Sequence, residues 1–259
     1  MTPNAVVKPV SSVVDNFLTF VGETTLIAFD AAKRLFSSRF EGAETINQMA
    51  FIGVASVPIV VLTNFCSGAV LSLYTAQFLT QYGGHAFVGA TVGLAVTREI
   101  GPVIAGIMVA ARCGSAMTAQ IGTMAVTEQI DALRMLSVHP TNYLVIPRII
   151  AGVLMMPVLA LVGVFAGGVG GVLVAKATGV PVGQFMESVR TYVRPWDLTG
   201  GVLKGPFFGL IIALIACQQG LRTTNGAVGV GRSTTNTVVI SMVLIYVVNF
   251  FLAQLFFQH

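Results

Sequence analysis

The sequence has very little charge. Only 9% of its 259 residues are Asp, Glu, Lys or Arg, whereas 55% are hydrophobic. Soluble domains carry about 25% charged residues, so this scarcity excludes a water-soluble fold of this size and indicates an integral membrane protein. Four long stretches contain no charged side chain at all, namely 45–97, 149–175, 205–221 and 233–259.

The charge-free stretches predict about five membrane spans. A spanning helix needs about 20 apolar residues, and the stretch 45–97 is long enough for two spans joined by a polar turn at 81–85. A transmembrane β-barrel would need short segments of alternating hydrophobicity, which 149–161 does not show. The predicted fold is therefore an all-α integral membrane protein. Its spans are expected at roughly 50–80, 86–111, 148–175, 200–221 and 234–257.

Patterns of catalytic and metal-binding residues are also missing. The three cysteines show no metal-ligand spacing, and no Ser–His–Asp set is present. The segment 226–233 approaches a phosphate-binding loop, but Arg232 replaces the lysine and a membrane span precedes it in place of a strand. We therefore expect no enzyme activity, catalytic residue, metal or cofactor in this chain. The net charge of +4 is modest and predicts no nucleic-acid binding.

The distribution of Lys and Arg predicts the orientation. These residues gather on the cytoplasmic side of membrane proteins, and a cytoplasmic N-terminus with an external C-terminus puts most of them there. Residues 1–44 are interrupted by acidic residues and do not resemble a signal peptide. Their periodicity predicts an amphipathic helix in the inner membrane interface, with Glu23 and Asp30 on its polar face. A cytosolic helix packed on the bundle is the alternative.

Three charged residues fall within the predicted spans, besides Arg148 at the inner boundary of the third. Arg98 and Glu99 lie near the middle of the second span, and adjacent helical residues point about 100° apart, so each needs its own partner. Lys204, at a similar height in the fourth span, is the candidate partner of Glu99. Alternatively, the second span begins only near Gly101 and leaves the pair at a membrane surface, or Lys204 extends outward to the interface. Charge inside a membrane is costly and usually functional.

Two further features are candidate binding surfaces. Leu71, Tyr74, Phe78 and Tyr82 share one face of the first span and could contact an acyl chain. A helix–helix seam with an interfacial aromatic anchor at Tyr82 is the alternative, which the residues alone favour. The short amphipathic segment 128–134 lies between spans two and three and could dock in a groove of a partner; a plain connecting loop is the alternative. Ile130, Leu133 and Leu136 are expected to face the bundle, with Glu128, Asp131 and Arg134 facing water.

These residues occur in motifs whose order resembles that of the MlaE/YrbE permeases, the membrane subunits of ABC transporters associated with MCE proteins. The motifs are REIGP at 98–102, ARCGSA at 111–116, QIGTM at 120–124, TEQIDAL at 127–133, PR at 147–148 and GVGRSTT at 229–235. The resemblance implies a homodimer that binds two cytosolic ATPase subunits and an MCE-domain protein on the outer side. It also implies that residues 45–259 form the permease domain, with a cytosolic coupling helix near 127–136.

The resemblance further implies roles for single residues. Leu71 and Tyr82 match positions that line a lipid pocket in the family, and Arg98, Glu99 and Lys204 match charged positions tied to function. The ATPase-coupling positions would be Thr127, Glu128, Gln129, Asp131, Leu133 and Arg134.

The sequence is accordingly interpreted as the permease subunit of a lipid transporter of the inner membrane, with phospholipid as the expected cargo. ATP and Mg²⁺ would be bound by the separate ATPase subunit. Two other classes stay open at this point. One is an ion-coupled secondary transporter of a hydrophobic substrate, in which the intramembrane charges form a relay. The other is a membrane scaffold that transports nothing, suggested by the glycines of the third span at 163, 167 and 171.

Overall fold

The chain folds into a bundle of long helices. The computed structural model describes residues 4–37 and 42–257, and no strand occurs among them. Five helical segments of this part of the chain are long and apolar enough to cross a membrane. They are Gly42–Gln81, His85–Val126, Thr141–Ala177, Pro195–Leu221 and Gly226–Phe257. The predicted number of spans and the all-α fold are confirmed, and each segment extends beyond its predicted bounds at one or both ends.

Short irregular turns divide several spans. The first span breaks at a 3-10 turn, Val54–Ser56, and the second contains π-helical turns at Val96–Ile100 and Ala110–Gly114. A third π-helical turn, Thr141–Val145, opens the third span. The α-helices are α1 (Asn4–Ser37), α2 (Gly42–Ile52), α3 (Val57–Gln81), α4 (Val88–Ala95), α5 (Gly101–Val109), α6 (Ser115–Val126), α7 (Gln129–Met135), α8 (Ile146–Ala177), α9 (Val182–Tyr192), α10 (Pro195–Leu221) and α11 (Gly226–Phe257).

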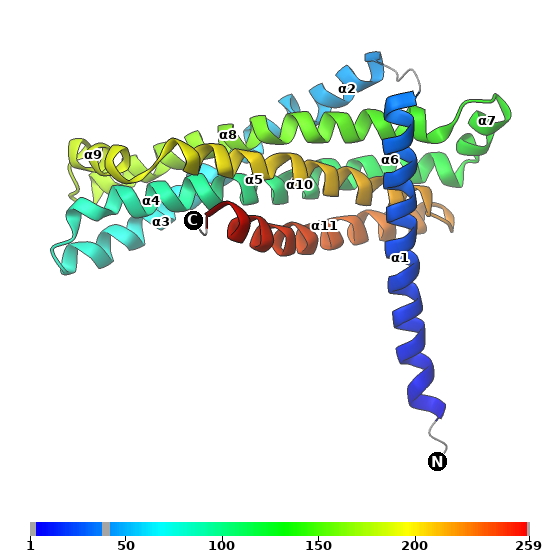
Figure 1. The fold of residues 1–259 in the computed structure, drawn as a ribbon, viewed down its shortest axis with the longest axis horizontal. Coiled ribbons are helices and arrows are strands. Elements are labelled where there is room, and N and C mark those ends of the chain that lie inside the picture. Colours follow the sequence, from blue (N-terminus) through cyan, green and yellow to red (C-terminus); the bar gives the residue numbers. More distant parts are fainter. Residues whose placement is uncertain (1–3, 38–41, 258–259) are drawn as a thin grey trace.

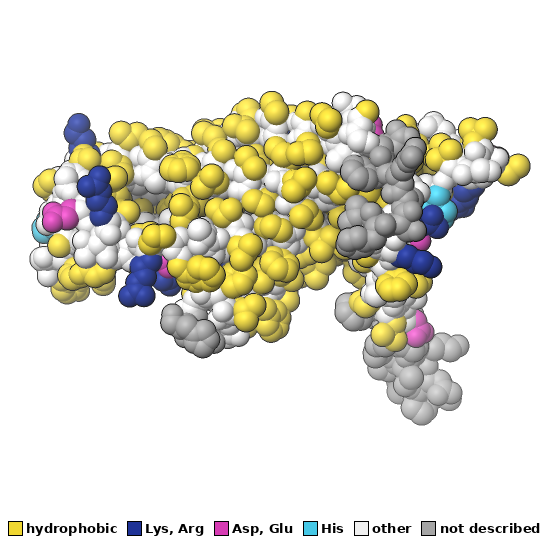
Figure 2. Space-filling model, turned by 45° about the horizontal axis from the view of Figure 1, so that its top comes forward, with side chains coloured by type: hydrophobic (Ala, Val, Ile, Leu, Met, Phe, Trp, Pro, Cys, Tyr) yellow, Lys and Arg dark blue, Asp and Glu magenta, His cyan; other side chains and the backbone are white. Residues whose placement is uncertain are grey.

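The bundle has two distinct ends (Figure 1). Helix α9 and the turn between α3 and α4 lie at one end, and α7 lies at the other, where α1 crosses the bundle at a steep angle. Figure 2 shows hydrophobic side chains covering the middle of the bundle, whereas Lys, Arg, Asp and Glu side chains gather at its ends. This distribution is typical of a protein whose middle lies in lipid and whose ends meet water.

Glycines bring the spans into close contact. Helix α8 packs between α3 and α10, and its glycines face backbone atoms of both neighbours. Gly152 of α8 faces Gly209 of α10, and Ser72 of α3 donates a hydrogen bond of 2.7 Å to the carbonyl of Gly171. Small residues let helices approach in lipid, where van der Waals contact and interhelical hydrogen bonds hold them together.

Two neighbouring glycines of α8 predict opposite effects of the same substitution. A Cβ atom at Gly170 would run into the carbonyl oxygen of Phe65, whereas one at Gly168 would have no other atom within 4 Å. We expect Gly170→Ala to lower the free energy of unfolding by about 1–3 kcal/mol, because the two backbones must separate. Gly168→Ala should leave it unchanged or raise it by up to about 1 kcal/mol through helix propensity. Unfolding titrations in detergent measure both; equal midpoints would contradict this packing.

Candidate functional site

The centre of the site is a π-helical turn in the second span. Val96–Ile100 carries Arg98 and Glu99, and Pro102 follows in the first turn of α5. Proline has no N–H, so the carbonyl of residue 98, four positions earlier, lacks its α-helical donor. Lys204 of α10 supplies the missing hydrogen bond, with Nζ 2.9 Å from the Arg98 carbonyl oxygen. The helix therefore continues across the proline because a charged side chain from another span replaces the backbone donor.

Lys204 also binds Glu99, as expected from their similar heights. The Lys204 side chain is fully buried, and its Nζ lies 2.6 Å from Oε1 of Glu99. The third acceptor of the ammonium group is Oδ1 of Asn249 in α11, at 2.9 Å. Asn249 in turn donates from Nδ2 to Oε2 of Glu99 at 2.7 Å. The three side chains thus form a closed polar network that joins spans two, four and five. The alternative in which Lys204 extends outward to the interface is wrong.

Arg98 takes a different partner, as the angle between adjacent helical residues requires. Its Nε and Nη2 lie 2.8 and 2.6 Å from Oδ1 of Asp197, whose side chain is buried in the first turn of α10. The other carboxylate oxygen, Oδ2, accepts the backbone N–H of Arg194 at 2.7 Å, which caps α10. The helical segment that carries Arg98 and Glu99 begins at His85, so both residues lie within a continuous helix.

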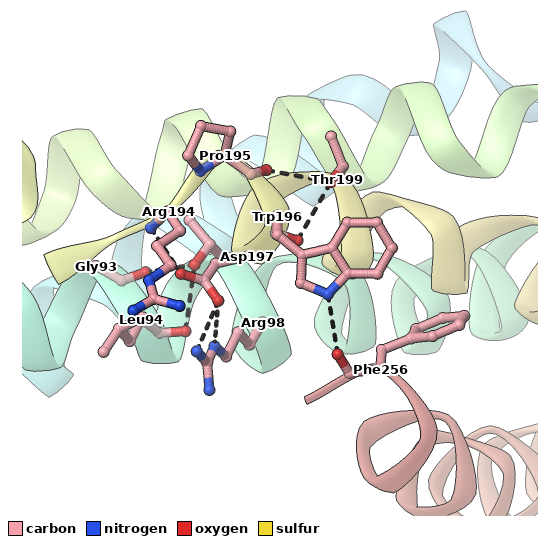
Figure 3. Close-up of polar contacts among 10 residues, drawn as sticks. Gly93, Leu94, Arg98, Arg194, Pro195, Trp196, Asp197, Thr199 and Phe256 are labelled. Atoms are coloured by element: carbon pink, nitrogen blue, oxygen red, sulfur yellow. Dashed lines mark hydrogen bonds and ion pairs between the residues drawn. The ribbon is translucent and has the colours of Figure 1, made fainter. Parts of the chain in front are cut away.

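The end of α11 is fixed to the same place. The indole Nε1 of Trp196 donates to the carbonyl of Phe256 at 3.0 Å (Figure 3). The adjacent ring of Phe257 lies 4.7 Å from the Arg98 guanidinium carbon and 5.2 Å from Lys204 Nζ. Figure 3 shows Arg98 and Trp196 on either side of Asp197. Arg98, Glu99 and Lys204 are therefore brought together, and their partners Asp197 and Asn249 were not among the predicted site residues.

The aromatic side chains predicted to form a row on the first span are exposed on the surface of this chain. Tyr74, Phe78 and Tyr82 are each more than 60% exposed, and the rings of Phe78 and Tyr82 lie 5.2 Å apart. Leu71 is partly buried and packs against neighbouring apolar side chains. Leu71 and Tyr74 line a shallow cavity of about 450 Å³ on α3. No described helix of the same chain covers the row, so a seam within the chain does not explain it.

Helix α7 projects from the bundle between two left-handed residues. Glu128 (φ 60°) precedes it and Ser137 (φ 61°) follows it, so the chain turns sharply at both ends. Ile130 is buried, as predicted, and anchors the helix. Leu136 does not face the bundle as predicted: it is 74% exposed beside Met135, which is 87% exposed. The prediction assumed that the apolar spacing of three residues continues to Leu136, which lies just beyond the last residue of α7.

The polar residues of the segment lie mostly on its surface. Asp131 and Arg134 form an exposed ion pair of 2.9 Å within α7, and Leu133 is half-buried. Thr127 donates to the carbonyl of Thr123 at 2.7 Å, at the end of α6, and Gln129 begins α7 with an exposed side chain. The segment 127–134 thus contains most of the short helix α7 with its exposed surface and is not a plain loop.

Helix α1 binds the α7 end of the bundle through its acidic residues. Gln218 of α10 donates to Glu23 at 2.8 Å, and Thr141 donates to Asp30 at 2.7 Å. Partial burial alone would raise the pKa of Asp30, but the hydrogen bond from Thr141 and the bond and charge of Arg34 outweigh it and hold this pKa below its usual 3.8. Part of the predicted polar face therefore contacts the bundle. The predicted domain boundary after residue 44 falls inside α2, which begins at Gly42. Residues 38–41, between α1 and α2, lie outside the described residues.

Comparison with known proteins gives one consistent family. A family model described as "Permease MlaE" matches residues 45–255. A "Probable ABC transporter permease protein" of Rickettsia felis is 40% identical over 243 residues, covering 93% of this chain and 94% of the relative. A protein of Synechocystis sp., also described as a probable ABC transporter permease protein, is 40% identical over 225 residues, covering 86% of each chain. "Protein TRIGALACTOSYLDIACYLGLYCEROL 1, chloroplastic" of Arabidopsis thaliana is 37% identical over 234 residues, covering 90% of this chain and 67% of the relative.

Proposed function

This chain belongs to the MlaE family of ABC transporter permeases, and on that premise we propose that it is the membrane subunit of an ATP-driven lipid transporter. Phospholipid is the proposed cargo. The energy would come from ATP and Mg²⁺ bound by two cytosolic ATPase subunits, and an MCE-domain protein would exchange lipid on the outer side. The chain would lie in the inner membrane with its N-terminus and α7 in the cytoplasm and its C-terminus outside.

The observation that carries this proposal is the bare aromatic row of α3. Tyr74, Phe78 and Tyr82 offer a wide apolar surface that the chain itself leaves uncovered. Burying acyl carbon on such a surface is worth about 0.8 kcal/mol per CH₂ group, which suits a lipid better than a polar solute. One relative that covers most of this chain is named after a galactolipid. That name supports a lipid cargo.

A second copy of the chain would close the shallow cavity that Leu71 and Tyr74 line on α3. Helix α11 also exposes a long apolar face that includes Tyr246, Phe250 and Phe251. Closed two-fold dimers are the commonest oligomers, and in lipid such faces would associate through van der Waals packing. We propose that the α3 and α11 faces of two copies enclose the lipid. Helix α7, with its exposed Met135 and Leu136, would be the contact to the ATPase.

Transport in reconstituted vesicles tests the proposal. The chain is co-purified with its ATPase and MCE partners, placed in proteoliposomes and supplied with a fluorescent phospholipid. We expect lipid movement that needs hydrolysable ATP and falls about tenfold in Tyr74→Ala/Phe78→Ala, because two apolar contacts to the acyl chain are lost. Phe207→Ala, at an exposed aromatic of α10, is the matched control and should leave transport unchanged. Lipid movement independent of ATP, or failure to bind any ATPase, would overturn the proposal.

A further inference from the structure

Arg112 of the second span has no carboxylate partner among the described residues. It lies half-buried in the π-helical turn Ala110–Gly114. Arg98 and Lys204 each hold a carboxylate, and Arg148, which also lacks one, is 4% exposed and closed to any ligand. Charged side chains within membrane spans are costly and normally pair with another charge or with backbone carbonyls. Arg112 therefore carries an uncompensated positive charge inside the bundle.

One corner of the Arg112 guanidinium group is occupied by neutral partners. Nη1 donates to the Ser56 hydroxyl at 3.2 Å, to the carbonyl of Phe51 at 3.4 Å and to the Cys113 thiol at 3.5 Å. The Phe51 ring lies 5.6 Å from the guanidinium carbon. No acceptor in the described part of the chain takes the hydrogens of Nε and Nη2. These two atoms can therefore donate side by side to two oxygens of a phosphate.

An apolar path leads from Arg112 toward the outer end of the bundle. Met108 and Ile104, one and two turns earlier in α5, are half-buried, and α5 packs against α3. On the first span, Ser56 and Tyr74 are 18 residues apart, which is five full helical turns, so they point to the same side. The shallow cavity on α3 begins ten residues, or about 15 Å, beyond Ser56. A lipid tail spans about half of the 30 Å hydrocarbon core, so a lipid held at Arg112 reaches that cavity.

The depth of Arg112 gives such a lipid a definite orientation. Thr118, six residues nearer the inner end, donates to the carbonyl of Ala216 at 3.2 Å, and Gln218, two residues further along α10, binds Glu23 of α1. Arg112 thus lies about 12 Å from α1, toward the middle of the bundle. With α1 in the inner interface, as the sequence predicts, a headgroup at Arg112 is nearer the inner surface than its tail. The lipid keeps the polarity of the inner leaflet but has left the plane of its headgroups, as a transported lipid must.

We propose that Nε and Nη2 of Arg112 bind the phosphate of the transported lipid, whose tail runs along α5 and α3 toward Tyr74. The inference rests on the proposed lipid cargo and names the headgroup chemistry that the permease holds. A phosphate supplies the negative charge that Arg112 lacks, and Arg112 offsets the cost of bringing a phosphate into the membrane. A lipid without phosphate offers its tail to the same surface but supplies no counter-ion.

Competition between two lipids with the same tails tests this site. The purified full-length chain is equilibrated in detergent with equal amounts of phosphatidylglycerol and diacylglycerol, and native mass spectrometry counts the lipid of each kind that is retained. We expect the parent to prefer phosphatidylglycerol about tenfold, because charge-assisted hydrogen bonds hold the phosphate. Arg112→Gln should lose this preference, and Arg112→Lys should keep part of it, since lysine keeps the charge but not the paired donors.

A second variant keeps the arginine and supplies a counter-ion within the chain. Ser56→Asp places a carboxylate where the hydroxyl now lies 3.2 Å from Nη1. It should fold like the parent but lose the preference for phosphatidylglycerol, because Arg112 is then already paired. Arg190→Gln is the matched control: it removes an exposed cation from α9, at the opposite end of the bundle from α7, and should keep the preference.

The outcomes separate this inference from the proposed cargo. Equal retention of the two lipids by the parent, or an unchanged preference in Arg112→Gln, would overturn the role of Arg112 and leave a lipid cargo standing. Loss of both lipids alike in Arg112→Gln, with the preference intact in Ser56→Asp, would make Arg112 a structural residue only. A parent chain that retains neither lipid would overturn both proposals.

Discussion

Replacing Lys204 by methionine is expected to lower the free energy of unfolding by about 3 kcal/mol. The fully buried ammonium group holds three acceptors, one of which is the Arg98 carbonyl that Pro102 leaves without a donor. Removing one partner of a buried ion pair costs about 3–5 kcal/mol, because the other charge stays behind unpaired. The lower end of that range applies here, since Glu99 is 41% exposed and keeps its bond to Asn249.

Thermal or denaturant unfolding in detergent measures this loss. Lys176→Met is the matched control: Lys176 is exposed at the end of α8, and the same substitution there should change stability by less than about 0.5 kcal/mol. Similar losses in both variants would show that the buried network contributes nothing specific.

Exchanging the charges of Glu99 and Lys204 tests whether their pairing, and not burial alone, accounts for their contribution. Glu99→Lys and Lys204→Glu should each abolish folding or transport, because like charges then meet inside the bundle. The double variant should recover part of the stability, since opposite charges face each other again. Recovery stays incomplete because a glutamate at position 204 cannot donate to the Arg98 carbonyl. Absence of any recovery would contradict the pairing as the reason for the two charges.

Glutamate at the exposed tip of α7 is expected to weaken binding of the ATPase subunit at least thirtyfold. Met135 and Leu136 are 87% and 74% exposed, which is unusual for apolar side chains at the water-facing end of a bundle. Central apolar anchors of an interface contribute about 2 kcal/mol or more each, and about 1.4 kcal/mol corresponds to a tenfold change in affinity. Met135→Glu/Leu136→Glu should therefore separate the complex, and pull-down with titration of the ATPase measures it.

The control for this loss lies at the opposite end of the bundle. Val182→Glu places the same charge on an exposed apolar position of α9 and should leave ATPase binding intact. The α7 variant should also keep its unfolding midpoint, because neither side chain is buried. A complex that survives in the α7 variant would show that the ATPase binds elsewhere.

Much of this architecture could be predicted from the sequence, because lipid imposes simple rules. Five apolar segments follow from length and hydropathy alone, and they are present. The Glu99–Lys204 pair follows from two charges at similar heights in spans of the same direction. The separate partners of Arg98 and Glu99 follow from helical geometry. These predictions succeeded because each depends on one dominant energy, the cost of unpaired polar groups in lipid.

The missed residues depend on details that patterns do not encode. Asp197 carried a usable signal, since Pro195 and an acidic residue two positions later mark the first turn of a helix, near the height of Arg98. Asn249 carried less, because a single amide in a long apolar run does not reveal which span it faces. The π-helical turn at Val96–Ile100 leaves no mark in composition at all.

One prediction was wrong and another was incomplete, each for a local reason. Leu136 faces outward because it lies six residues, or about 240° of helical rotation, from the buried Ile130, so a repeated spacing of three residues leaves the buried face. The acidic residues of α1 were placed on a polar face, yet Glu23 and Asp30 find hydrogen-bond donors on the bundle. Periodicity identifies a polar face but not whether water or a polar neighbour covers it.

The two left-handed residues that flank α7 also affect how force would travel through the molecule. Glu128 and Ser137 turn the chain sharply at both ends of α7, so that this short helix directly connects the end of α6 to the π-helical turn that opens the third span. A displacement of α7 would then move the end of α6 and the start of the third span together. Spans two and three would therefore tilt as a linked pair, and the paired charges of span two, Arg98 and Glu99, would be displaced by motion that begins at the far end of the bundle.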